Sequence, residues 1–343
     1  MVGALVVRDG EVVGSGWHRQ VGGPHAEVEA LREAGERARG AALYVTLEPC
    51  SHFGRTPPCV DAVLATGIAR VVACHRDPNP LVSGHGFAKL REAGVEVEEG
   101  VLAAEAVRLN LRFLTAVTLG RPAVTLKWAM SLDGRIATVT GQSQWLSSSQ
   151  GRRWALALRE EHDAILVGIG TVLADDPRLD RRLGLAGGPN VRVVLDRRLR
   201  TPTDARLFTV KEPVLIYTET AGGEQLEALM TRSADVITLP AVEPESVLAD
   251  LHRRGIQSLL VEGGSEVLAS FVTSGCYDRT LVDCAPMLIG GKGAPGPLGG
   301  EGFATLDAAA RLEGLETRRR GSDLILAAYR EGCLPALLSS VGA

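Results

Sequence analysis

Four side chains near the start of the chain have the residue types and spacing of a catalytic metal site. His25 precedes Glu27 by two residues. Cys50 directly follows Pro49, and Cys59 comes nine residues later. One imidazole and two thiolates suit tetrahedral zinc, and three protein ligands leave a fourth position open for water or substrate. A carboxylate beside that position can carry a proton from water to a substrate atom. We therefore predict zinc-assisted hydrolysis, with Glu27 as the catalytic proton carrier and three metal ligands: His25, Cys50 and Cys59.

The same residues also admit simpler interpretations, namely a structural zinc site or no metal at all. The zinc deaminase pattern is His-x-Glu followed by Pro-Cys-x-x-Cys. Here eight residues separate the two cysteines, so the match is to a variant of that pattern. Glu27 favours catalysis, because a structural site has no use for that acid. The alternative of another class is a zinc-stabilised, non-catalytic binding module.

A second candidate site lies late in the chain, where an apolar run ends in Glu262-Gly263-Gly264-Ser265. A strand that runs into Gly-Gly-Ser and then a helix exposes backbone amides at the helix N-terminus, where the helix dipole favours a phosphate. By itself the motif is better explained as an ordinary tight strand–helix turn. It is not the dinucleotide fingerprint G-x-G-x-x-G, so a Rossmann domain is not predicted.

Length and composition indicate a two-domain protein and do not point to a macromolecular ligand. The 343 residues are 45% hydrophobic, which suits two cores rather than one. A net charge of −4 disfavours a nucleic-acid partner. Six cysteines in this length do not indicate a disulfide scaffold, and no basic leader or membrane-spanning run is visible. We expect a cytoplasmic protein; whether it forms a homo-oligomer is left open.

The elements that must position these residues alternate between strand and helix. Apolar runs of strand length occur at residues 5–7, 11–16, 42–46, 71–74, 95–98, 124–128, 164–167, 191–195, 214–217 and 258–261. Helical stretches are expected at residues 26–39, 57–65, 87–93, 104–118, 152–161 and 222–233. This alternation indicates an α/β protein, and Asp9-Gly10 predicts a hairpin turn. Gly120-Arg121-Pro122 interrupts the pattern, so we expect domains at 1–119 and 122–331 and a tail at 332–343.

Several long motifs resemble one family. Residues 46–59, Thr-Leu-Glu-Pro-Cys-Ser-His-Phe-Gly-Arg-Thr-Pro-Pro-Cys, are similar to the deaminase signature of the bifunctional riboflavin-biosynthesis deaminase/reductases. Asp-Pro-Asn-Pro at 77–80 and Gly-His-Gly at 84–86 resemble the next loop of that family. Residues 126–137, 143–145, 168–177 and 261–265 resemble its reductase half. The resemblance implies a cytidine-deaminase-like N-terminal domain and a dihydrofolate-reductase-like C-terminal domain.

The resemblance also implies an activity and a set of contacts. The first domain would use Zn²⁺ to deaminate 2,5-diamino-6-(5-phosphoribosylamino)pyrimidin-4-one, and the second would use NADPH to reduce the ribosyl group to ribityl. In the first domain, the implied substrate contacts are His18, His52 and Arg55. Taken without the resemblance, His18 is explained equally well as an ordinary histidine on a surface strand. In the second domain they are Lys127, Ser143, Arg159, Leu179, Arg182 and Glu262. The implied NADPH contacts are Met130, Trp145, Thr171, Asp175, Gly264, Ser265, Glu266, Val267, Leu268, Ala269 and Ser270.

Two departures from the family pattern affect these expectations. Relatives carry Ser or Thr near the cofactor where this chain has Arg197. We expect Arg197 to be a cofactor contact, where it either replaces the family's local contact or adds a charge near the 2′-phosphate of NADPH. Relatives also carry a helix and a Pro-Asn-Pro segment before the first strand, whereas this chain begins at Met1. We therefore expect Met1 to be an internal methionine of a longer natural protein. The corresponding alternative is a reductase-only enzyme whose deaminase is impaired.

Overall fold

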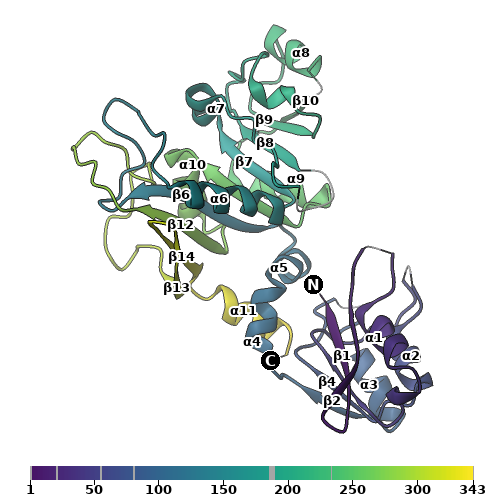
Figure 1. Cartoon of the computed structure of the whole chain (residues 1–343). Coiled ribbons are helices and arrows are strands. Elements are labelled where there is room, and N and C mark those ends of the chain that lie inside the picture. Colours follow the sequence, from purple (N-terminus) through teal and green to yellow (C-terminus); the bar gives the residue numbers. More distant parts are fainter. Residues whose placement is uncertain are drawn as a thin grey trace. The chain divides into compact units, whose positions relative to one another are not determined.

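The computed structural model describes residues 2–20, 22–54, 56–79, 82–184, 190–232 and 234–342. They form two compact units, one of residues 2–119 with 334–342 and one of residues 120–333. Figure 1 shows the strands and helices of each unit. Among the described residues, no helix combines the length and apolarity needed to cross a membrane.

The first unit is built on a sheet of five strands in the order β2-β1-β3-β4-β5. Its strands are β1 (Gly3–Arg8), β2 (Glu11–Trp17), β3 (Ala42–Val45), β4 (Arg70–Ala73) and β5 (Glu96–Glu99). β1 pairs antiparallel with β2 and β3, while β3, β4 and β5 run parallel. Asp9 and Gly10 form the predicted hairpin turn, and both have the positive φ, 52° and 83°, that such a turn requires.

Three helices cover one face of this sheet: α1 (Ala26–Ala34), α2 (Cys59–Ala65) and α3 (His85–Glu92). Their buried residues, such as Leu31, Val63 and Phe87, form one core with Val6 and Leu43 of the strands. A Cβ atom at Gly16 would lie 2.2 Å from the carbonyl oxygen of Ala26. Only glycine therefore lets β2 approach the first turn of α1.

Other helices of this unit differ from the sequence prediction. The single helix expected at 104–118 is divided at Asn110 into α4 (Ala103–Leu109) and α5 (Leu111–Leu119). α1 ends early and continues as the 3₁₀ helix η1 (Gly35–Ala38). Where a tail was expected, the chain forms α11 (Cys333–Ser340). Residues after Cys333 belong to the first unit, and the carbonyl of Val341 accepts a hydrogen bond from the amide of Arg76.

The second unit is built on a sheet of nine strands in the order β10-β9-β8-β7-β11-β6-β12-β14-β13. Its strands are β6 (Ala123–Ser131), β7 (Ala164–Gly168), β8 (Val191–Leu195), β9 (Val214–Thr218), β10 (Ala234–Thr238), β11 (Ser258–Gly263), β12 (Arg279–Ala285), β13 (Leu312–Arg320) and β14 (Asp323–Arg330). In sheet order, the strands β10, β9, β8, β7, β11, β6 and β12 run parallel to one another. β14 then pairs antiparallel with β12, and β13 pairs antiparallel with β14. β10, β12, β13 and β14 were not predicted.

Helices cover both faces of the central strands, as a parallel sheet requires. On β11, Leu260 packs with Leu158 of α6, while Leu259 and Val261 face the side that holds α9 and α10. The helices are α6 (Ser149–Glu161), α7 (Ile169–Asp175), α8 (Glu224–Met230), α9 (Pro244–Arg253) and α10 (Ser265–Ser274), and η2 (Arg206–Thr209) is a short 3₁₀ helix. Because β6, β7, β8 and β11 are parallel, their carboxyl ends meet at one edge of the sheet, where ligands bind in such folds.

Candidate functional site

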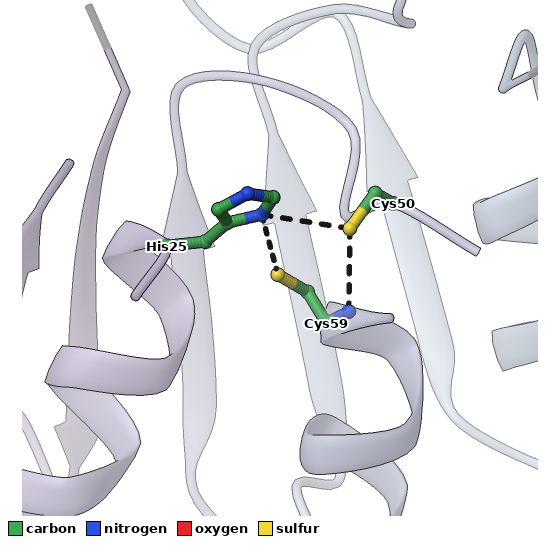
Figure 2. Close-up of side chains that lie close together, drawn as sticks. All are labelled: His25, Cys50 and Cys59. Carbon is green, nitrogen blue, oxygen red and sulfur yellow. Dashed lines mark hydrogen bonds between the residues drawn. The ribbon is translucent and has the colours of Figure 1, made fainter. Parts of the chain in front are cut away.

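The three predicted zinc ligands come together at the ends of two helices (Figure 2). His25 directly precedes α1, Cys59 is the first residue of α2, and Cys50 lies in the loop after β3. The Nδ1 atom of His25 lies 3.1 Å from the Sγ of Cys59 and 3.5 Å from the Sγ of Cys50. Zinc bonds of about 2.3 Å to sulfur and about 2.1 Å to nitrogen place two tetrahedral ligand atoms about 3.6 Å apart. The donor set therefore has the size and chemistry of a zinc site.

The two cysteines differ strongly in their affinity for a proton. Hydrogen bonds from the side chain and the backbone amide of Cys59, at 3.3 Å for the amide, help lower the pKa of Cys50 to about 4. The same hydrogen bond to Cys50, together with burial, raises the pKa of Cys59. One member of the pair is thus already a thiolate, which is the form that binds a metal.

Glu27 lies beside the three donor atoms in the first turn of α1. Its side chain is 3% exposed, and its Oε2 atom has no hydrogen-bond partner among the described residues. Burial raises the pKa of Glu27 to about 7. A carboxyl group that titrates near neutrality can both accept and release a proton, which is the property predicted for this residue.

A cavity of about 230 Å³ opens beside the donor atoms. It is lined by His18, Gly22, His25, Cys50, His52, Gly54 and Thr56. The ring of His18 packs edge-on against that of His25 at 5.3 Å, and its Nδ1 donates to the carbonyl of Pro24. The Nδ1 of His52 is buried without a hydrogen-bond partner among the described residues. Both histidines predicted to contact substrate therefore lie in the cavity; Arg55 lies outside the described residues.

Glu48 supports this site from behind and was missed at the sequence level. Its buried carboxylate accepts hydrogen bonds from the amides of Gly84 and Gly86, both at 2.9 Å, and from Asp77 and Phe87, at 3.1 and 3.3 Å. These bonds tie the start of α3 to the segment that carries Cys50. An acid two residues before the Cys50 ligand was the only available signal, and its partners lie 29 to 39 residues away.

In the second unit, three of the predicted substrate contacts, Lys127, Arg159 and Glu262, lie together beside β6 and β11. Lys127 lies on β6, and Glu262 on β11 follows Val261, which pairs with Leu126. Glu262 and Lys127 therefore stand side by side on the face covered by α6. Arg159 of α6 donates from Nε and Nη2 to the two carboxylate oxygens of Glu262, at 2.7 and 2.8 Å.

This ion pair is nearly closed to solvent. The side chains of Arg159 and Glu262 are 14% and 9% exposed. Burial alone would raise the pKa of Glu262, but the charge and hydrogen bonds of Arg159, with a contribution from Lys127, lower it to about 2. The site thus presents a carboxylate that is ionised near neutral pH beside a lysine.

The predicted cofactor contacts lie along the same edge of the sheet. Gly264 has a φ of 82° and directly precedes α10, whose first turn consists of predicted NADPH contacts. Its N-cap residue is Gly264, which has no side chain to cap the first amides, and amides at a helix N-terminus favour an anion such as phosphate. A Cβ atom at Gly264 would lie 3.6 Å from the hydroxyl oxygen of Thr171, and one at Gly168 would lie 2.7 Å from Val267. Residues of α7 and α10 thus pack closely around this turn.

The other predicted contacts of this unit are not part of the Arg159–Glu262 ion pair or of the turn at Gly264. Trp145 is 67% exposed, and the guanidinium group of Arg152 stacks against its ring at 4.8 Å from the ring centroid. Arg182 is half-exposed and pairs with Asp180, while Leu179 is buried. The remaining positions are Met130 on β6, Ser143 in the loop that follows, Asp175 at the end of α7, Arg197 after β8, and Ser265, Glu266, Leu268, Ala269 and Ser270 on α10.

Comparison with protein families matches each unit separately. Residues 1–75 match the cytidine and deoxycytidylate deaminase zinc-binding region, and residues 122–326 match the RibD C-terminal domain. A zinc-binding deaminase unit joined to a dihydrofolate-reductase-like unit defines a bifunctional deaminase/reductase, and the predicted fold class is confirmed.

Relatives of similar length extend this result to the whole chain. Riboflavin biosynthesis protein RibD of Aquifex aeolicus is 44% identical over 325 residues, which cover 95% of this chain and 90% of the relative. That of Bacillus amyloliquefaciens is 45% identical over 96% of this chain and 90% of the relative. The structure of Acinetobacter baumannii RibD is similar with a TM-score of 0.85 and 35% identity, covering 96% of this chain and 92% of the other. The chain belongs to the RibD family of riboflavin biosynthesis.

Proposed function

We propose that this chain catalyses two consecutive reactions of riboflavin biosynthesis on one small molecule. The first is hydrolytic deamination of 2,5-diamino-6-(5-phosphoribosylamino)pyrimidin-4-one, and the second is NADPH-dependent reduction of its ribosyl group to ribityl. A similar structure from Thermotoga maritima, with 37% identity and a TM-score of 0.83, is described as a diaminohydroxyphosphoribosylaminopyrimidine deaminase and 5-amino-6-(5-phosphoribosylamino)uracil reductase. The observation that carries the proposal is the donor triad beside a buried Glu27 oxygen that has no hydrogen-bond partner in the described part of the chain.

In the deaminase unit, we assign zinc binding to His25, Cys50 and Cys59. Bound zinc supplies the Lewis acidity that makes water nucleophilic near neutral pH. Glu27 would accept a proton from water at Oε2 and pass it to the ring nitrogen as the hydroxide adds to the ring carbon. It would then take a second proton from the new hydroxyl group and deliver it to the amino group, which leaves as ammonia when its bond to the ring carbon breaks. His18 and His52 orient the pyrimidine by hydrogen bonds, and Arg55 binds a phosphate or carbonyl oxygen.

In the reductase unit, the turn at Gly264 and the first turn of α10 bind a phosphate of the cofactor. NADPH supplies the hydride. Lys127 and Arg182 attract the sugar phosphate, and the Arg159–Glu262 pair fixes a carboxylate beside the ribose. Because Glu262 stays ionised, it accepts hydrogen bonds from substrate hydroxyl groups and holds the sugar in one orientation.

The compartment and partners follow from the same chemistry. All six cysteines are free, and a site that depends on thiolates favours the reducing cytoplasm. The partner is a phosphoribosylaminopyrimidine and not a nucleic acid, since the chain has a net charge of −4. Whether two or more copies associate is left open.

The test is to assay each half-reaction separately on the same zinc-loaded preparation. Ammonia release from the diaminopyrimidine in the absence of NADPH reports the deaminase. NADPH oxidation with the deaminated substrate reports the reductase. We expect both activities. Reductase activity without ammonia release would contradict the bifunctional assignment for this chain.

A further inference from the structure

The imidazole of His25 is contacted on both of its ring nitrogens by a single short segment of chain. Its Nδ1 faces the sulfur of Cys59, and its Nε2 lies 3.2 Å from the hydroxyl oxygen of Thr56. Thr56 precedes Cys59 by only three residues, and the two residues between them are prolines. Residues 56–59 therefore hold the ring from two sides.

The chemistry of the ring decides which atom donates in the contact with Thr56. An imidazole that presents the Nδ1 lone pair to a metal carries its proton on Nε2. The hydroxyl of Thr56 must then accept a hydrogen bond from Nε2–H. Metal-binding histidines commonly donate their second N–H to such an acceptor, which fixes the tautomer and the ring plane.

The connection between Thr56 and Cys59 makes this acceptor unusually well placed. Proline fixes φ near −65°, and Pro58 is buried with a φ of −58°. The amide of Gly54 also donates to the carbonyl of Thr56 at 3.3 Å, which closes the turn on the other side. The position of the hydroxyl is thus linked through a stiff segment to the position of the Cys59 ligand.

We propose that Thr56 is a positioning residue of the zinc site, whose hydroxyl holds His25 in the tautomer and orientation that bind the metal. This rests on the proposed assignment of His25 as a zinc ligand. Thr56 does not contact the metal itself, so its removal weakens zinc binding without changing the number of zinc ions at saturation.

The experiment measures zinc affinity by competition with a chromophoric chelator, using the full chain. Thr56→Val keeps the shape of the side chain but removes the acceptor, and we expect zinc to bind about 10–100-fold more weakly. Thr56→Ser restores the hydroxyl and should bind within a few-fold of the parent. Thr66→Val makes the same chemical change at the far end of α2, where the hydroxyl bonds only to helix carbonyls, and should not alter affinity.

Two further measurements separate positioning from folding. Thr56→Ala removes the same acceptor with a smaller side chain, and it should weaken zinc binding as the valine variant does. Thermal unfolding of the metal-free variants and their reductase activity should match the parent. Unchanged zinc affinity in both the valine and alanine variants would overturn the proposal, as would equal weakening by serine and valine.

The ligand assignment has its own control. Cys50→Ala should lose stoichiometric zinc. If that variant retained as much zinc as the parent, the assigned ligand set would fail, and the role of Thr56 with it. If Cys50→Ala loses zinc but Thr56→Val does not weaken it, only the proposal for Thr56 fails.

Discussion

Arg159 and Glu262 are 103 residues apart in the chain, yet their side chains form a two-pronged ion pair beside Lys127. Arg159 comes from the last turn of α6, and Glu262 from the end of a central strand. The two parallel hydrogen bonds fix both the position and the plane of the carboxylate. This pair is the part of the proposed reductase site whose geometry is best defined.

Replacing this arginine by lysine should impair reduction selectively. Arg159→Lys keeps the charge but replaces the planar fork by a point donor, so Glu262 is no longer held in one plane. Loss of one charge-assisted hydrogen bond costs about 1.5–3 kcal/mol, so reductase kcat/KM should fall about 10–100-fold. Arg153→Lys, at an exposed position of the same helix, is the matched control. An equal loss of deaminase activity would show that the effect is general unfolding.

Glu27→Gln should separate metal binding from deamination. The amide cannot exchange a proton with the substrate, so deamination should fall by about 10²–10⁴-fold. Zinc content should remain at the parental level, because Glu27 is not a predicted ligand. Metal analysis and ammonia release on the same preparation check both statements, with reductase activity as the folding control. Deamination within a few-fold of the parent would exclude Glu27 as the proton carrier.

Arg197 should contribute to the preference for NADPH over NADH. The residue follows β8 at the carboxyl edge of the sheet, and its side chain is 58% exposed, with Glu219 3.4 Å away. An arginine that reaches the 2′-phosphate adds roughly one charge-assisted hydrogen bond. We expect Arg197→Ser to lower the NADPH-to-NADH ratio of kcat/KM about tenfold, since about 1.4 kcal/mol corresponds to a factor of ten. Arg198→Ser, at the exposed neighbouring position, should leave the ratio unchanged. Equal efficiency of the parent with both cofactors would rule the preference out.

Asp283 should make the stability of the second unit depend on pH. It lies on β12 close to Asp323, and a Cβ atom at Gly151 would meet an oxygen of each carboxylate, at 2.6 and 2.3 Å. Burial raises the pKa of Asp283, and the charge of Asp323 adds to this. Because the folded-state pKa lies above the unfolded value of about 3.9, the free energy of unfolding falls as pH rises from about 4 through the folded pKa.

Asp283→Asn removes this titration and should therefore raise the melting temperature of the second unit near neutral pH. The gain should shrink as pH is lowered and vanish below about pH 3, where the parental carboxyl is protonated in both the folded and the unfolded state. Thermal unfolding over this pH range measures it, and Asp307→Asn at an exposed position is the control. A shift of the same size at every pH would mean that packing, and not proton binding, causes it.

Local features of the sequence determined the zinc chemistry and much of the secondary structure. The donor types of His25, Cys50 and Cys59 with an acid at position 27 predicted a catalytic metal site, because ligand preference is a property of the side chains themselves. Asp9-Gly10 predicted its hairpin because a two-residue turn requires positive φ at both positions. The family motifs predicted both units, and the comparisons confirmed the bifunctional class.

Tertiary structure alone decided the interactions between distant residues. Nothing local in the sequence predicts that Glu48 accepts four amides of the segment around α3, or that residues 334–342 join the first unit. The same holds for Thr56, whose contact with His25 depends on how a loop returns to a helix 31 residues earlier. The strands β10, β12, β13 and β14 were missed because strand stability comes from cross-strand neighbours, which only the assembled sheet provides.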